Sequence, residues 1–118
     1  MKKQIRLIAL DLDGTLLDDQ KQLSENNIQA LAECARRGRQ VVPATGRPAD
    51  GGAKELCAIP GVRYALTTNG GAVVDLETGR RLSQCVLSNE QALQILDIVR
   101  QYHVMYDPYV QGRGITHS

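Results

Sequence analysis

Two aspartates, Asp11 and Asp13, stand two positions apart after an apolar run, and Gly14 follows them directly. Neighbouring carboxylates repel each other, so such a pair favours a bound cation, and Mg²⁺ prefers carboxylate and phosphate oxygens. The glycine allows a sharp turn whose main-chain N–H groups can point at an anion. The pattern therefore predicts a site for phosphate and magnesium, whereas acids without this setting are more often part of a solvated loop.

Calcium is the obvious alternative for acids beside a glycine. An EF-hand loop that began at Asp11 would need an acid or Asn at position 15, Gly at position 16 and Glu at position 22. The sequence has Thr15, Leu16 and Gln22 at these places, which excludes that loop.

Two further polar clusters follow later apolar runs. Thr45 and Gly46 offer a hydroxyl and a closely approaching N–H to a phosphate oxygen, and Arg47 adds a charged fork. Asn69 precedes two glycines in the second cluster. Taken alone, Thr45 is equally suited to cap a helix, and Asn69 with Gly70 is a common turn.

The elements that must position these residues alternate between strands and helices. Three apolar runs predict strands, the first of them largely buried, at residues 5–10, 40–45 and 62–68. Ser24 can cap a helix that ends at Gly38. A second helix is expected between Pro48 and Pro60. This order is typical of a parallel sheet, in which the three polar clusters meet at one edge.

The remainder of the chain has a different pattern. Residues 71–86 predict an antiparallel hairpin with its turn near residues 77–79. Ser88 and Gln91 form a capping box that begins a helix, whose apolar face comprises Ala92, Ile95, Leu96 and Val99. A strand is expected at 103–110, a turn at 111–114, and the first residues of another strand at 115–118.

The composition excludes several classes of protein. Among 118 residues, 14 basic and 13 acidic side chains leave a net charge of +1, which argues against nucleic-acid and membrane-surface binding. Three widely spaced cysteines, with no CxxC pair, indicate neither a zinc site nor a disulfide framework and favour the reducing cytoplasm. No signal peptide or membrane span is expected, because the apolar run near the N-terminus is short.

Three motifs in order, DLDGTLL, TGRP and TNGG, resemble those of the haloacid dehalogenase superfamily in its Cof-type (IIB) branch. The resemblance implies an α/β fold, with a Rossmann-like parallel three-layer core that is incomplete in this chain. Residues 1–82 would form the N-terminal part of that core, and residues 83–118 the beginning of an inserted α/β cap domain. It also implies a magnesium-dependent phosphatase of small phosphorylated metabolites such as sugar phosphates.

The resemblance assigns the chemistry to two residues. Asp11 would attack phosphorus and form an aspartyl-phosphate. Asp13 would act as general acid toward the leaving group and then as base for water. Mg²⁺ would be held by Asp11 and Asp13, through the carboxylate of the first and the main-chain carbonyl of the second.

The phosphate contacts are assigned in the same way. They would come from the main-chain N–H groups of Leu12 and Asp13 together with Thr45 and Gly46. Arg47 and Asn69 match positions that line the site near the cap, as weaker candidates for substrate binding.

Some features of the family are missing from this sequence. The sequence has no counterpart of the family's lysine beyond the cap, or of the pair of acids that completes the magnesium shell. Lys21 and Lys54 stand at the wrong places in the chain order to replace that lysine. We therefore expect a truncated chain with negligible activity, whose first strand is an open apolar edge that promotes self-association. A phosphomutase or phosphotransferase of the same superfamily and a non-catalytic interaction module are the alternatives.

Overall fold

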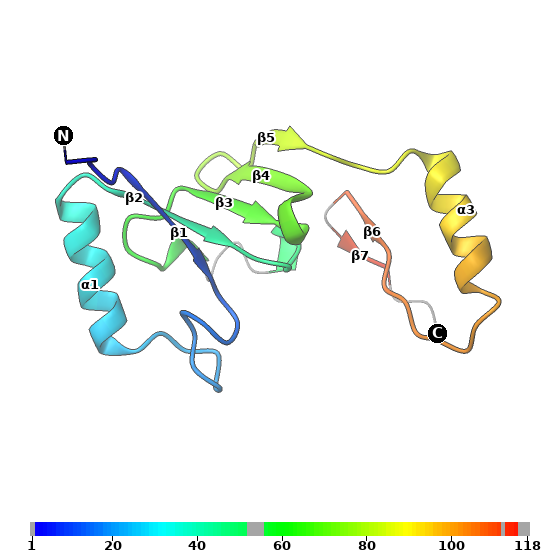
Figure 1. Ribbon diagram of the computed structural model, residues 1–118, viewed down its shortest axis with the longest axis horizontal. Helices are drawn as coiled ribbons and strands as arrows, with labels where there is room; N and C mark the ends of the chain where they lie inside the picture. Colours follow the sequence, from blue (N-terminus) through cyan, green and yellow to red (C-terminus); the bar gives the residue numbers. More distant parts are fainter. Residues whose placement is uncertain (1, 52–55, 112, 116–118) are drawn as a thin grey trace.

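The computed structural model describes residues 2–51, 56–111 and 113–115. They form a five-stranded sheet with one packed helix, followed by an extended connection to a second helix and a small hairpin (Figure 1). No helix in these residues is long and apolar enough to cross a membrane.

The sheet has the strand order β1-β2-β3-β4-β5. The first three strands, β1 (Leu7–Asp11), β2 (Gln40–Ala44) and β3 (Tyr64–Thr67), are parallel. The next two, β4 (Ala72–Asp75) and β5 (Arg81–Gln84), continue the sheet as an antiparallel hairpin. The expected α/β fold with a parallel sheet is therefore confirmed, and so is the hairpin, whose turn contains Gly79 at φ +73°.

The first strand lies at the edge of the sheet. It begins two residues later than expected and pairs with β2 alone among the described strands. Leu7 is 57% exposed, so the expectation of a largely buried strand was wrong. The reason is that burial requires a neighbour on both sides and cover on both faces, whereas β1 has one neighbour in the part of the chain that the structure describes.

The helix α1 (Glu25–Arg36) has the ends that the sequence predicts. The Ser24 hydroxyl accepts a hydrogen bond from the Asn27 N–H at 3.2 Å, and Gly38 adopts φ +71° just beyond the C-terminus. Leu31 is the one buried residue of α1. It packs in the core of the sheet with Leu12, Leu16, Val41, Leu56, Ile59 and Ala65.

Pro43 lies inside β2 although proline cannot donate to a sheet ladder. The Gln40 N–H bonds to β1 through the Arg6 carbonyl, and the Thr45 N–H bonds to β3 through the Leu66 carbonyl. Alternation along the strand puts the missing N–H of Pro43 on the β3 side. On that side the strand ladder is limited to the pair Ala44 and Leu66, so the missing N–H of Pro43 costs the sheet little hydrogen bonding.

The helix expected between Pro48 and Pro60 falls partly on residues 52–55, which lie outside the described residues. Ahead of them, Ala49–Gly51 form the single 3₁₀ turn η1. After them, Leu56 and Cys57 have helical backbone.

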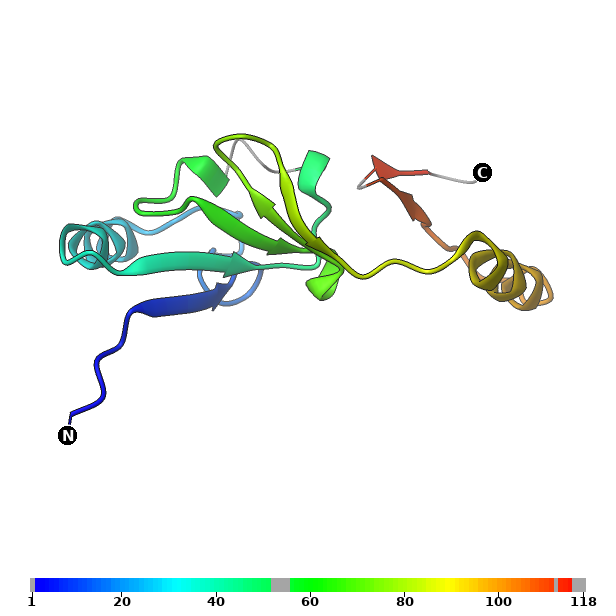
Figure 2. The ribbon, with the colours of Figure 1, turned by 90° about the horizontal axis from the view of Figure 1, so that it is seen from above.

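The helix α3 (Asn89–Val99) begins with the expected capping box between Ser88 and Gln91. Its apolar face is not buried: Ile95 is 45% exposed, and the other three residues of that face, Ala92, Leu96 and Val99, are half-buried. Figure 2 shows α3 set apart from the sheet at the far end of the connection after β5.

The strand expected at residues 103–110 was largely wrong. Only β6 (Tyr109–Val110) forms there, and β7 (Arg113–Gly114) falls where a turn was expected. Pro108 precedes β6, and its carbonyl accepts the Ile115 N–H. Proline has no N–H to donate in return, so the ladder is limited to two residue pairs. Ile115 is not in a strand, and residues 116–118 lie outside the described residues.

Candidate active site

A tight turn follows β1 and holds the two aspartates at the surface. The Leu16 N–H bonds to the Asp11 carbonyl at 3.2 Å, and the Leu17 N–H bonds to the Leu12 carbonyl at 2.9 Å. Gly14 adopts φ +75°, a conformation that glycine adopts without strain. The Leu12 side chain is 1% exposed and anchors the turn in the core, so only its main chain can reach a ligand.

Asp11 is held in place by its neighbour in the turn. The Thr15 hydroxyl donates a hydrogen bond to Asp11 Oδ2 at 2.9 Å. Asp11 makes no ion pair with a described residue, and it lies at the carboxyl end of β1, where ligands of parallel sheets bind. The carboxylate is therefore exposed and oriented at the edge where a phosphate would approach.

Asp13 is neutralised by two cations. Arg47 forms a two-pronged pair with it, with Nε 3.0 Å from Oδ2 and Nη2 2.7 Å from Oδ1. Lys21 Nζ lies 2.9 Å from Oδ1. The hydrogen bonds from Arg47 and then from Lys21 lower the pKa of the Asp13 carboxyl to about 2. Asp13 is therefore ionised at neutral pH in this arrangement.

Lys21 is a candidate site residue that the sequence did not reveal. Its place in the chain order argued only against its replacing the family's lysine beyond the cap, and a compact loop brings it to Asp13. Asp18 Oδ1 accepts the N–H groups of Gln20 and Gln22, each at 2.9 Å, and Lys21 adopts φ +61° at the tip. The available signal in the sequence was Asp18, because an aspartate often accepts the N–H groups of the residues that follow it in a turn. Lys54 lies outside the described residues.

The loops after β2 and β3 are hydrogen-bonded to each other. The Asn69 N–H donates to the Thr45 carbonyl at 3.1 Å, and the Thr68 N–H donates to the Arg47 carbonyl at 3.0 Å. The buried Thr45 hydroxyl accepts the Arg47 N–H at 3.0 Å, which leaves its own hydrogen for an anion. A Cβ at Gly46 would lie 3.0 Å from Asn69 Oδ1, so glycine allows the loops to approach.

The oxygen donors present suit magnesium but supply only part of its shell. The described residues contain no group of three or more His, Cys, Asp or Glu that could hold a metal. The Asp11 carboxylate and the Asp13 main-chain carbonyl are oxygen donors, and Mg²⁺ commonly retains waters and substrate phosphate oxygens beside one or two carboxylates. The Asp13 carboxylate, already paired with Arg47 and Lys21, does not need a metal to balance its charge.

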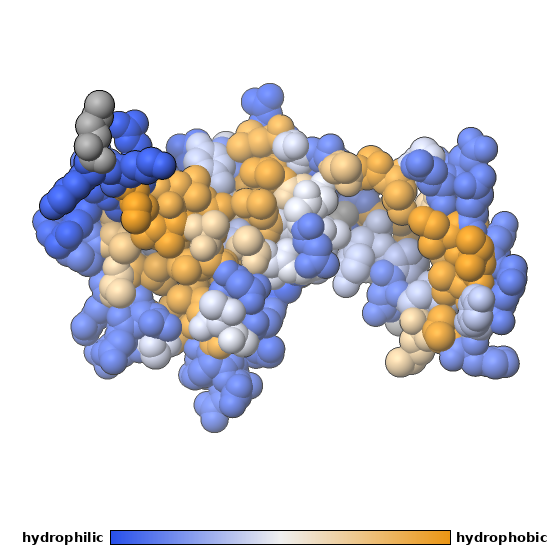
Figure 3. Space-filling view, viewed as in Figure 1, coloured by the Kyte–Doolittle hydropathy of each residue, from blue (hydrophilic) through white to orange (hydrophobic). Residues whose placement is uncertain are grey.

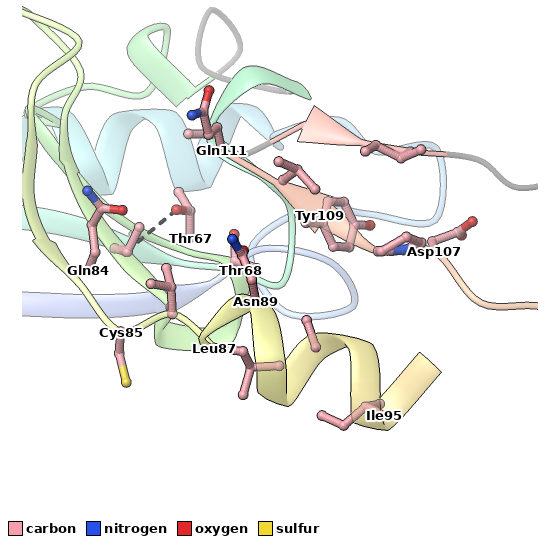
Figure 4. A pocket seen from close by; sticks show the side chains of 18 of the residues that line it. Thr67, Thr68, Gln84, Cys85, Leu87, Asn89, Ile95, Asp107, Tyr109 and Gln111 are labelled. Carbon is pink, nitrogen blue, oxygen red and sulfur yellow. Dashed lines mark hydrogen bonds between the residues drawn. The ribbon is translucent and has the colours of Figure 1, made fainter. Parts of the chain in front are cut away.

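A separate hollow lies between the ends of β3, β4 and β5 and the segment from α3 to β6. It has a volume of about 820 Å³ and mostly apolar walls, with Thr67 and Thr68 on one side and Leu87, Ile95 and Tyr109 on the other (Figure 4). The lining does not include Asp11, Asp13, Lys21, Thr45, Gly46, Arg47 or Asn69. The hollow borders the site through Thr68, whose N–H is bonded to Arg47.

These motifs and this geometry can be compared with known proteins. A family model described as haloacid dehalogenase-like hydrolase matches residues 8–117. The chain belongs to this family. The resemblance drawn from the three motifs is thus confirmed for nearly the whole sequence.

Relatives within the haloacid dehalogenase-like hydrolases include named phosphatases. Phosphatase YwpJ of Bacillus subtilis is 31% identical over 105 residues, which are 89% of this chain and 36% of that protein. The pyridoxal phosphate phosphatase YbhA of Escherichia coli is 32% identical over 99 residues, 84% of this chain and again 36% of the relative.

A solved haloacid dehalogenase-like hydrolase from Bacteroides thetaiotaomicron has the same fold. It matches with a TM-score of 0.72 and 30% identity over 90% of this chain and 41% of that one. The chain thus spans little more than a third of the length of the curated relatives.

Proposed function

We propose that this chain carries the phosphate-binding part of a phosphatase that acts on small phosphorylated metabolites. The observation that supports this most is the position of Asp11, an oriented and exposed carboxylate at the end of β1 with Thr45 after the next strand. The names of the phosphatase relatives agree with it. The free thiols of its three cysteines support a place in the reducing cytoplasm.

In the proposed reaction, an Asp11 oxygen attacks phosphorus, and the bond from phosphorus to the leaving-group oxygen breaks. The leaving group takes a proton from Asp13, which must first be released from Arg47 and Lys21 and protonated. Water then attacks the aspartyl-phosphate and gives a proton to Asp13. This step regenerates the Asp11 carboxylate and releases inorganic phosphate. Magnesium, when bound at Asp11 and the Asp13 carbonyl, offsets phosphoryl charge.

Arg47 and Lys21 have a second task in this proposal. Both lie at the Asp13 carboxylate, so a phosphate dianion that enters the turn meets two positive charges. The anion can draw them from Asp13 because phosphate offers more acceptor oxygens and more negative charge. The N–H groups of Leu12 and Asp13, the Thr45 hydroxyl and the Gly46 N–H would complete the contacts, with Asn69 beside them.

The division of the chain is also part of the proposal. Residues 1–82 would belong to the core and residues 83–118 to a cap, although β5 runs across this boundary and ends at Gln84. The hollow between β3–β5 and α3–β6 would then lie between core and cap. We expect the 118-residue chain to have negligible turnover, because its two oxygen donors hold magnesium weakly.

The test is binding of beryllium fluoride, which mimics an aspartyl-phosphate, in the presence of Mg²⁺. At a Mg²⁺ concentration high enough to fill this weak site, we expect ¹⁹F NMR to show a bound signal for the chain and for Asp19→Asn, an exposed acid in the next loop. Asp11→Asn should lose the signal, because the amide cannot form the acyl-fluoroberyllate bond. An equal signal from Asp11→Asn, or none from the unaltered chain, would contradict the proposal.

A further inference from the structure

The turn η2 (Thr68–Gly70) after β3 holds two residues other than glycine in the left-handed region. Thr68 has φ 52° and Asn69 has φ 54°. Asparagine tolerates this conformation, whereas a β-branched residue such as threonine is strained in it. The described residues contain four such positions, and three of them, Lys21, Thr68 and Asn69, contact residues of the candidate site. Strain of this kind persists where the surrounding contacts enforce it.

The left-handed turn points two successive N–H groups at the loop after β2. The Thr68 N–H reaches the Arg47 carbonyl at 3.0 Å. The next N–H, that of Asn69, reaches the Thr45 carbonyl at 3.1 Å. In an extended strand, successive N–H groups point to opposite sides, so a continued strand at Thr68 would turn one of these donors away. The two contacts with the loop after β2 therefore require the strained backbone.

Hydrogen bonds hold this turn, because little hydrophobic cover lies over it. Figure 3 shows a pale surface, neither strongly hydrophobic nor strongly hydrophilic, where Figure 1 places the end of β3. The preceding residue, Thr67, is fully buried, and its hydroxyl donates to the Ala72 carbonyl at 3.5 Å. The Thr68 carbonyl accepts the Gly71 N–H at 3.0 Å. The main chain of Thr68 is thus anchored to the end of the sheet and can fix the neighbouring loop.

Arg47 is held through its main chain on both sides. Its N–H donates to the Thr45 hydroxyl at 3.0 Å, and its carbonyl accepts the Thr68 N–H. From this fixed main chain, the guanidinium reaches Asp13 with both prongs. A two-pronged pair needs one orientation of the guanidinium, so it depends on where the main chain of Arg47 is held.

We infer that Thr68 is a positioning residue for Arg47. Its N–H fixes the loop from which Arg47 reaches Asp13, and the left-handed turn keeps that N–H in place. The Thr68 side chain lines the separate hollow (Figure 4), and the link to Arg47 is made by the main chain. The effect of this link on phosphate binding rests on the proposed function, whereas its effect on the pair of Arg47 with Asp13 does not.

The test removes the Thr68 N–H and leaves every side chain unchanged. Chemical ligation at the free Cys57 allows an ester in front of Thr68, in which oxygen replaces the N–H. The readout is exchange of the Arg47 Nε–H with water by NMR, and the signal is assigned by its loss in Arg47→Lys. We expect exchange roughly fivefold faster than in the unaltered chain, because the loop loses one hydrogen bond. Phosphate affinity should fall by a similar factor.

The matched control is an ester in front of Gly79. The Gly79 N–H bonds to the Asp75 carbonyl at 2.8 Å in another turn, so this ester also removes one main-chain hydrogen bond. It should change neither the exchange of the Arg47 Nε–H nor the phosphate affinity.

Two substitutions act on Thr68 in other ways. Gly71 has φ −65°, which alanine adopts freely, but a Cβ there would lie 3.1 Å from the Thr68 carbonyl oxygen. Gly71→Ala therefore displaces the Thr68 main chain and should speed exchange of the Arg47 Nε–H roughly twofold. Thr68→Gly keeps the N–H and relieves the strain, so it should melt no lower than the unaltered chain and retain slow exchange at Arg47.

Exchange at Arg47 that the Thr68 ester leaves unchanged, or that the Gly79 ester speeds equally, would overturn the inference. Circular dichroism checks that each variant is folded, and Gly71→Ala decides the matter if the Thr68 ester is unfolded. Faster exchange in the Thr68 ester, with no phosphate binding by the unaltered chain, would support this inference and contradict the proposed function.

Discussion

Arg47 holds Asp13 with both prongs of its guanidinium, at 3.0 Å from Nε to Oδ2 and 2.7 Å from Nη2 to Oδ1. These residues are 34 positions apart in the sequence and come from the ends of adjacent strands. Two-pronged pairs fix orientation as well as charge. The pair therefore joins the turn after β1 to the loop after β2 and places a cation beside the proposed phosphate position.

The two cations at Asp13 should contribute unequally to anion binding. Arg47 is 26% exposed in its side chain and Lys21 is 60% exposed, so water screens the lysine more. We expect Arg47→Gln to weaken inorganic phosphate binding roughly 10- to 100-fold. Lys21→Gln should weaken it by about fivefold or less. Phosphate titration followed by ³¹P NMR measures both.

Arg80→Gln is the control for these variants, because it removes one exposed positive charge in the β4–β5 turn. It should leave phosphate affinity unchanged. If all three variants weakened binding equally, net charge rather than position would explain the effect, and the roles given to Arg47 and Lys21 would be wrong.

The contact between Gly46 and Asn69 should appear as an energetic coupling. Gly46→Ala places a methyl group 3.0 Å from Asn69 Oδ1, so the exposed side chain must shift, at a cost below about 1 kcal/mol in the free energy of unfolding. Asn69→Gly removes the side chain that the methyl group would meet, and glycine adopts the φ of 54° at position 69 without strain. In urea unfolding, the double variant should therefore lose less stability than the sum of the single variants, by about 0.5 kcal/mol.

Gly79→Ala provides the comparison for this coupling. Gly79 has φ +73°, and a methyl group added there would meet no atom within 4 Å, so the cost of the substitution comes from the backbone alone. Asn69→Gly should not alter that cost. Additive effects at Gly46 and Asn69 would show that the two loops do not press against each other.

Asp75 should make stability depend on pH. It is buried at the end of β4, and burial raises its pKa, but the Arg63 guanidinium at 3.3 Å and the Glu77 N–H outweigh this and lower the pKa below 3.8. A lowered native pKa means that the stabilisation is present above pH 3.8 and is lost as the pH falls through the native value.

Thermal unfolding of Asp75→Asn measures this dependence. At pH 7 the variant should melt roughly 5 °C below the unaltered protein, and the difference should shrink in strong acid. Glu77→Gln removes the more exposed partner of Arg63, at 3.4 Å, and should change the melting temperature much less. A difference for Asp75→Asn that stayed constant in acid would refute the ionic explanation.

Local sequence determined the features that depend on neighbouring residues. Ser24 and Ser88 mark the starts of helices, because their short side chains accept a hydrogen bond from the main-chain N–H three positions ahead. Gly38 and Gly79 mark turns, because glycine adopts positive φ without strain. The alternation of apolar runs and helices predicted the parallel sheet. The order of polar clusters after the strands placed Asp11 and Thr45 at one edge.

Tertiary structure decided what depends on contacts between distant segments. The exposure of β1 follows from its neighbours in the sheet, and the strand at Tyr109–Val110 is short because its pairing ends at Pro108. Lys21 reaches Asp13 through the geometry of a compact loop, a contact that the sequence analysis did not predict. Sequence records which residues can be charged, but the fold fixes which charges meet, because electrostatic energy depends on distance in space.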